Sequence, residues 1–168
     1  MAIVGVSTSA DNFEQISARN DKKLCQVAGE ARKIIAPGAT TRSFTKAESG
    51  ALCLFDGVAV AYTLPPITDA TDLGMFFDFY TVVTTTSAHS VTCASGEFIG
   101  GEIMAASETA GAQDAFLADG TSHVAISTNG TTKGGLIGDQ FRLTAITLTQ
   151  WLVSGHIMTS GTAATPFA

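Results

Sequence analysis

Charge is scarce in this sequence. Charged residues make up 14% of its 168 residues, whereas hydrophobic residues make up 45%. Globular domains ordinarily carry about a quarter of charged residues. A surface so poor in charge is expected to be shared with neighbouring subunits instead of facing water. We therefore expect the chain to act within an assembly.

Long apolar segments are also missing. No uncharged apolar run reaches the ~18 residues that a membrane-spanning helix needs. The amino terminus, M-A-I-V-G-V-S-T-S-A-D, has neither the basic stretch nor the full apolar stretch of a secretory signal. We therefore expect no membrane partner, and synthesis in a cytoplasm.

Cysteine is too rare and too widely spaced for a framework of disulfides or a zinc site. Cys25, Cys53 and Cys93 form no C-x-x-C pair, and no histidine stands at ligand spacing from them. Cys53 and Cys93 lie in apolar, strand-like stretches. We expect them to be buried free thiols.

Catalytic and cofactor motifs are absent as well. The sequence has no G-x-S-x-G, no P-loop and no H-E-x-x-H. The glycine-rich residues 134–138 lack the lysine of a phosphate loop and precede a strand pattern instead of a helix. His89, His123 and His156 have no acid or cysteine beside them in the sequence. We expect no catalytic residue, no metal and no cofactor.

The few charges are unevenly placed. Up to Glu48, seven basic residues stand against five acidic ones, which gives +2, and from Gly50 onward Lys133 and Arg142 stand against ten acids, which gives −8. Phosphate would be repelled by the acidic part, and the basic part is too weak to form a stripe for nucleic acid. We expect no nucleic-acid partner.

The first 38 residues differ in texture from the rest. They show no strand alternation, they allow one or two helical turns over residues 13–18 and 22–30, and Pro37-Gly38 ends them. Their apolar content is high for a solvated tail. We interpret residues 1–38 as an extended arm that lies on a neighbouring protein, with a fraying terminus as the alternative.

Residues 39–168 have the pattern of an all-β domain. Short stretches of alternating apolar and polar residues are separated by Gly, Asp, Asn and Pro, which is typical of an antiparallel β-sandwich or a jelly-roll-like barrel. Asp56-Gly57 predicts a hairpin between strands 51–55 and 58–64. The three residues 147–149 predict a second hairpin between strands 139–146 and 150–158, with Trp151 on its inner face.

One stretch is apolar on both faces. In M-F-F-D-F-Y-T-V-V, Met75, Phe77 and Phe79 fall on one side of a strand, while Phe76 and Tyr80 fall on the other. Such a strand is expected at the centre of a sheet, with its second face covered by an arm or by another subunit.

The order of several segments is familiar. T-L-P-P is followed by F-D-F-Y-T-V-V, then by G-T-T-K-G-G-L-I-G-D, by W-L-V-S-G, and by G-T-A-A-T-P-F at the carboxyl end. This order resembles that of small bacteriophage virion proteins that decorate or cement the capsid. The resemblance covers residues 40–167 and leaves the arm outside. It is carried by a pattern of segments and includes no catalytic signature.

The resemblance implies a structural protein on the capsid surface of a virion. Its partners would be the major capsid protein and further copies of itself, as a homotrimer that bridges capsid subunits and stabilises the shell. We expect the arm to contact the capsid through apolar anchors and cations: Ile3, Val4, Val6, Phe13, Ile16, Arg19, Lys22, Lys23, Arg32 and Lys33. We expect the subunits to meet at Phe76, Tyr80, Pro166 and Phe167.

Two alternatives belong to other functional classes. A fibre or receptor-binding module of the same virion would bind glycans through exposed aromatic side chains. A small hydrolase would use Asp69 and Asp72, although aspartate is common in a turn-rich loop such as theirs.

Overall fold

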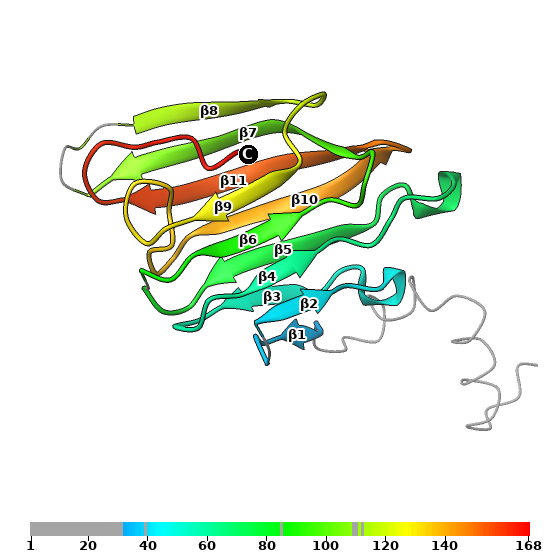
Figure 1. Ribbon diagram of the computed structural model, residues 1–168, viewed down its shortest axis with the longest axis horizontal. Helices are drawn as coiled ribbons and strands as arrows, with labels where there is room; N and C mark the ends of the chain where they lie inside the picture. The colour runs from blue at the N-terminus through cyan, green and yellow to red at the C-terminus, as the bar shows by residue number, and fades with distance from the viewer. Residues whose placement is uncertain (1–31, 39, 85, 109–110, 112) are drawn as a thin grey trace, which may run out of the picture. The chain divides into compact units, whose positions relative to one another are not determined.

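Strands dominate the computed structural model, which describes residues 32–38, 40–84, 86–108, 111 and 113–168 (Figure 1). The strands of the larger sheet are β1 (Ile34–Ile35), β3 (Leu52–Phe55), β5 (Phe76–Thr81), β7 (Phe98–Ser107), β8 (Gln113–Asp119), β10 (Gln140–Thr147) and β11 (Gln150–Thr159). Those of the smaller sheet are β2 (Thr41–Ser43), β4 (Ala61–Thr63), β6 (His89–Thr92) and β9 (Ala125–Thr128). Two short 3-10 helices, η1 (Lys46–Glu48) and η2 (Ala70–Asp72), precede β3 and β5.

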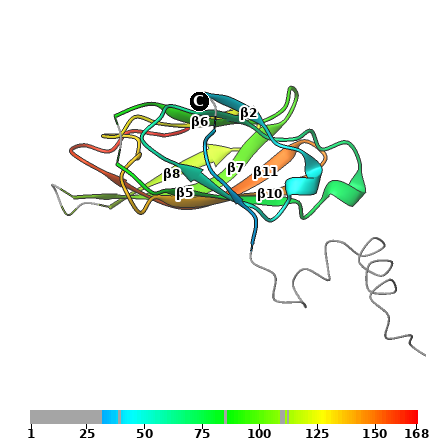
Figure 2. The ribbon, with the colours of Figure 1, turned by 90° about the horizontal axis from the view of Figure 1, so that it is seen from below.

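Residues 33–168 form a compact unit of their own. The larger sheet has the strand order β1-β3-β5-β10-β11-β7-β8, and the smaller has the order β2-β4-β6-β9. Figure 2 shows the two sheets of this unit as two layers. The prediction of an all-β fold is confirmed for the described residues, and none of their helices is long and apolar enough to cross a membrane.

Both sheets are mixed, so the prediction of an antiparallel fold is wrong. β1, β3 and β5 pair in parallel in the larger sheet, as do β2, β4 and β6 in the smaller one. From β1 to β7 successive strands lie in alternate sheets, so each pairs mostly with the strand after next. A chain that crosses to the other sheet and returns brings its next strand back in the same direction. Antiparallel pairs occur at β5-β10, β10-β11, β7-β8 and β6-β9.

Asp56 and Gly57 mark one of these crossings, and the hairpin predicted there does not form. β3 lies in the larger sheet and β4 in the smaller one. Phe55 and Tyr62 face each other across the core, with ring centroids 5.6 Å apart. The Asp56 carboxylate accepts a hydrogen bond from the Val58 amide at 2.8 Å, which holds the turn. Each strand thereby packs its inward side chains into the core between the two sheets.

The hairpin predicted near the carboxyl end is confirmed. β10 and β11 pair antiparallel, with Leu143 opposite Val153. Their inward side chains are buried, and Trp151 is fully buried. The Trp151 indole donates to the Glu97 carboxylate at 2.7 Å, so its only polar atom is satisfied in the core.

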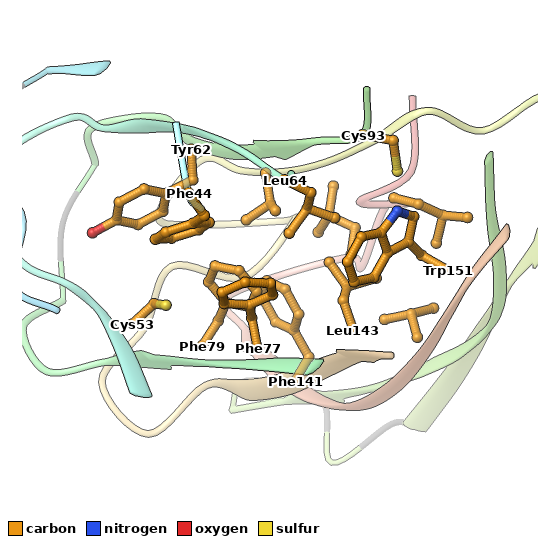
Figure 3. Packing of buried hydrophobic residues seen from close by; sticks show 14 of the residues in the cluster. Phe44, Cys53, Tyr62, Leu64, Phe77, Phe79, Cys93, Phe141, Leu143 and Trp151 are labelled. Carbon is orange, nitrogen blue, oxygen red and sulfur yellow. The ribbon is translucent and has the colours of Figure 1, made fainter. Parts of the chain in front are cut away.

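The core between the sheets is built around stacked aromatic rings (Figure 3). Phe44 stacks on Tyr62 and on Phe77, both at centroid distances of 4.9 Å. Phe79 of β5 stacks on Phe141 at 5.0 Å. The inward and outward sides of β5 are those predicted, and the strand is central in its sheet.

Two of the three cysteines lie within the described residues. Cys53 and Cys93 are buried free thiols, as predicted. Burial raises the pKa of Cys93 to about 12, so this thiol stays protonated at neutral pH. Cys25 lies outside the described residues.

The predicted boundary of the arm needs correction. Ile34 and Ile35, which we placed in the arm, form β1 and pair in parallel with Leu52 and Cys53 of β3. Ile35 is only 2% exposed and belongs to the core. The helical turns predicted for residues 13–18 and 22–30 lie outside the described residues. The β domain therefore begins at Lys33, earlier than the expected residue 39.

Candidate functional site

Most of the predicted capsid contacts lie outside the described residues: Ile3, Val4, Val6, Phe13, Ile16, Arg19, Lys22 and Lys23. Arg32 and Lys33 are the two that the structure describes, and both are exposed. Lys33 also marks the point where the leading segment joins the β domain.

The carboxylate of Glu48 holds this junction in place through hydrogen bonds. Glu48 accepts hydrogen bonds from the Lys33 ammonium at 2.9 Å, from the Arg42 guanidinium at 2.7 Å and from the Thr45 amide at 3.0 Å. Burial raises the pKa of Glu48, but these bonds outweigh it and bring the pKa down to about 2. The Thr45 contact belongs to a capping box at the start of η1. We call this set the Glu48 junction, and it gives Lys33 a partner within its own domain.

The two aromatic side chains predicted at a subunit contact, Phe76 and Tyr80, do point outward from β5 and are half-buried. Arg142 of β10 covers Phe76, with its guanidinium carbon 4.4 Å from the ring centroid. The same guanidinium holds both carboxylate oxygens of Asp78, at 2.6 and 2.8 Å. This bidentate contact raises the pKa of Arg142 and fixes the side chain over the ring.

The carboxyl-terminal residues predicted at the same contact are instead used inside the domain. Pro166 is buried and Phe167 is only 4% exposed, within the core. The backbone of this tail pairs with β9, since the Pro166 carbonyl accepts from the Ser127 amide at 2.8 Å. Both residues cover the edge of the smaller sheet and leave little side-chain surface for a neighbouring subunit, and the predicted contact there stays a prediction.

The larger sheet presents a broad outer face, by which we mean its side away from the core. A row of side chains crosses it in register: Asp78, Arg142, Ser154, Glu102 and Leu117. Apolar side chains lie among these polar ones, with Leu117 70% exposed, Leu152 42% and Met104 40%. The alternation of β7 and β11 could have shown that Met104 and Leu152 face outward, but the sequence prediction did not use them.

Comparisons with models of protein families, with curated proteins and with solved structures find no match for this chain.

Asp69 and Asp72, the pair that a hydrolase would use, stabilise η2. Asp69 accepts from the Thr71 amide at 2.8 Å. Asp72 accepts from the Lys46 ammonium at 2.6 Å and from the Thr68 amide at 2.8 Å. The Lys46 contact, followed by the Thr68 bond, holds the pKa of Asp72 far below its usual range. An ionised carboxylate bound in this way is a poor proton donor.

The glycine-rich loop before β10 is folded around a carboxylate of its own. Asp139 is only 2% exposed, and it accepts from the amides of Gly135 and Met158, both at 2.6 Å. Gly134 has a φ of +79°, and a Cβ there would lie 2.7 Å from the Asp139 carboxylate. The Asp139 carboxylate thus occupies a loop amide that a phosphate would need.

The histidines have separate environments. His89 is buried and stacks on Phe55 at a centroid distance of 4.7 Å, and burial lowers its pKa. His123 lies 3.2 Å from the Asp119 carboxylate, a contact that the sequence analysis did not anticipate. Within the described residues, no three His, Cys, Asp or Glu side chains are grouped to hold a metal ion.

Proposed function

We propose that this protein decorates a phage capsid, where it binds the outer surface of the head and stabilises the shell by bridging capsid subunits. Residues 33–168 would be a β-sandwich that acts as a rigid body, and residues 1–31 would be the segment that contacts the capsid. The protein acts by binding and has no catalytic role. The proposal includes a homotrimer, because three linked contact segments gain affinity through effective concentration.

The observation that carries the proposal is the Glu48 junction. The Lys33 ammonium donates a hydrogen bond to Glu48, and Ile35, two residues later, is buried in the core. A force on the leading segment would therefore be transmitted to Lys33, which the contact with Glu48 holds in place. The segment itself has the apolar residues Ile3, Val4 and Val6 that a protein surface could bury.

The mechanism is mass action. A protein that binds only the assembled shell, across joints between subunits, stabilises the shell by its binding free energy. The cations of the segment, Arg19, Lys22 and Lys23, would steer it to acidic patches and set its register.

Glycan binding by a fibre module has less support. Trp151 is fully buried, and the outward ring of Phe76 is covered by Arg142. Exposed aromatic faces are what such a site would need.

The test is to delete residues 1–31 and to measure co-sedimentation with expanded capsids. We expect a folded trimer that no longer sediments with the shell. In the full chain, replacing Arg19, Lys22 and Lys23 by alanine should weaken sedimentation, whereas Lys133→Ala, which removes a cation of the β domain, should not. Binding that survives the deletion would contradict the proposed contact, and light scattering that shows a monomer would contradict the trimer.

A further inference from the structure

Three of the four sheet edges are protected. β1 has two residues and β2 has three, so each offers little backbone for pairing. The edge at β9 is covered by the carboxyl-terminal tail, because Ala125 and Ala168 exchange two backbone hydrogen bonds of 3.0 Å. The fourth edge is β8, which borders the larger sheet beyond β7 (Figure 1).

Among the residues that the structure describes, β8 has none of these protections. It has seven residues, Q-D-A-F-L-A-D, without proline or lysine, the residues that commonly blunt an edge. The Gly120 amide donates a hydrogen bond to the Ile99 carbonyl of β7 at 2.9 Å. The Asp119 amide instead donates to the His123 ring at 3.3 Å. Inward and outward backbone groups alternate along an antiparallel edge, so the amides of Ala115 and Leu117 point away from β7. Within the described residues, no backbone bond outside the ladder is made to either amide.

The surroundings of this edge are acidic. Glu102 and Glu108 of the β7 side and Asp114 and Asp119 of β8 are all exposed. The sequence contains no lysine or arginine between Lys46 and Lys133, so neither β7 nor β8 carries a lysine or an arginine. Pairing of β8 with the same strand of a second copy would bring these acids together, and like charges on paired strands are destabilising. The charge therefore disfavours a second copy as the occupant.

We propose that β8 is the acceptor for an extended segment of another protein, one in which basic and apolar residues alternate, and that this segment joins the larger sheet as an additional strand. This proposal does not depend on the decoration role proposed above. Strand addition uses the backbone for affinity and alternate side chains for specificity.

The two faces of β8 determine this alternation. On the outer face, Leu117 lies opposite Glu102 on β7 and two residues from Asp119. Lysine side chains added on this face could lay their apolar stems on Leu117 and place their charges near the two acids. On the inner face, Phe116 is half-buried against the core, and a valine beside it would extend the core.

The experiment uses the full-length protein and a fluorescent peptide of alternating lysine and valine, about as long as β8. A peptide with glutamate in place of lysine is the matched probe. Leu117→Lys puts a charge on the open edge, and Glu102→Lys reverses the nearest acid. Leu152→Lys is the control variant, because Leu152 is exposed on the same outer face but belongs to β11, within the sheet.

We expect the lysine peptide to bind the wild-type protein and to slow amide hydrogen exchange at Ala115 and Leu117. Leu117→Lys and Glu102→Lys should each weaken binding about tenfold, and Leu152→Lys should leave it unchanged. Equal binding by Leu117→Lys and Leu152→Lys would overturn the proposal, as would equal binding of the glutamate peptide. A wild-type oligomer that Leu117→Lys dissociates would assign the edge to a second copy instead and would also overturn it.

Discussion

At the scale of single residues, the acidic side chains of the domain act mainly as acceptors for its own backbone and cations. Glu97 is 4% exposed and bridges the Ile67 amide, at 2.6 Å, and the Trp151 indole, at 2.7 Å. Glu48 and Asp72 do the same for the turns that precede β3 and β5. Buried donors cost free energy unless they find such partners. Few of the acids are therefore free to serve as a site.

Asp139 allows a prediction on pH. Burial raises its pKa from the ordinary 3.8 to about 6, against the opposing effect of the Met158 and Gly135 amides. A raised pKa means that the folded state binds the proton more tightly than the unfolded state does. The contribution of Asp139 to stability is therefore greatest at low pH and is lost as the pH rises through about 6.

The comparison is between the wild-type protein and Asp139→Asn, which cannot titrate. From pH 7 to pH 4, the wild-type free energy of unfolding should rise by about 2 kcal/mol relative to that of the variant. Urea unfolding followed by the fluorescence of Trp151 would measure both. Subtracting the free energy of unfolding of the variant from that of the wild type removes the effects of the other titrating groups. A difference that stays constant with pH would therefore refute this assignment.

At the scale of elements, alternation identified strands well but could not assign them to sheets. The β10-β11 hairpin was predictable because its three-residue link in the sequence is too short for a crossover, and its inward side chains alternate. The chain at Asp56 and Gly57 looks equally suited to a hairpin, yet it crosses the core. Whether a hairpin or a crossing forms there depends on which strand packs against Phe55 across the core. That choice is made only when the whole core assembles.

The candidate site was harder to predict for the same reason. Phe76 and Tyr80 were placed correctly on the outward side of β5, because period-two alternation is local. The partner of Glu97 on β11 is 54 residues away in the sequence, and that of Asp78 on β10 is 64 away. β1 was missed because two residues make no detectable pattern. Pairings of this range follow only from the fold.

The carboxyl-terminal tail gives a prediction at this scale. Phe167→Ala removes a buried ring and should lower the free energy of unfolding by about 3 kcal/mol. Thr162→Ala, an exposed change in the same tail, should have almost no effect. Because the ring is buried in its own chain, the loss should not depend on protein concentration. A concentration-dependent loss would instead show that Phe167 contributes to a contact between subunits.

At the scale of the whole molecule, the distribution of charge separates two parts of the chain. Residues 33–168 carry five basic residues against eleven acidic ones, and residues 1–32 carry four of each, which together give the net charge of −6. Cations of the domain are largely engaged, since Lys33 and Arg42 bind Glu48, Lys46 binds Asp72 and Arg142 binds Asp78. The net charge of −6 therefore lies in the domain, whereas the leading segment is neutral overall, and its Arg19, Lys22 and Lys23 would have to meet any acidic partner.

The boundary between these parts can be tested with two truncations. Removal of residues 1–31 should leave the free energy of unfolding of the domain nearly unchanged, because Lys33, Ile35 and their partners remain. Removal of residues 1–36, which lie within the arm of residues 1–38 that the sequence pattern suggested, deletes β1. It exposes the pocket of Ile35, frees the Leu52 amide from the Lys33 carbonyl and leaves Glu48 with one cation fewer. We expect the longer deletion to lower the free energy of unfolding by about 3 kcal/mol, most of it from the loss of the buried isoleucine.

Urea unfolding of the two truncated chains beside the full chain would measure this difference. Equal midpoints for both truncations would place the start of the domain after β1.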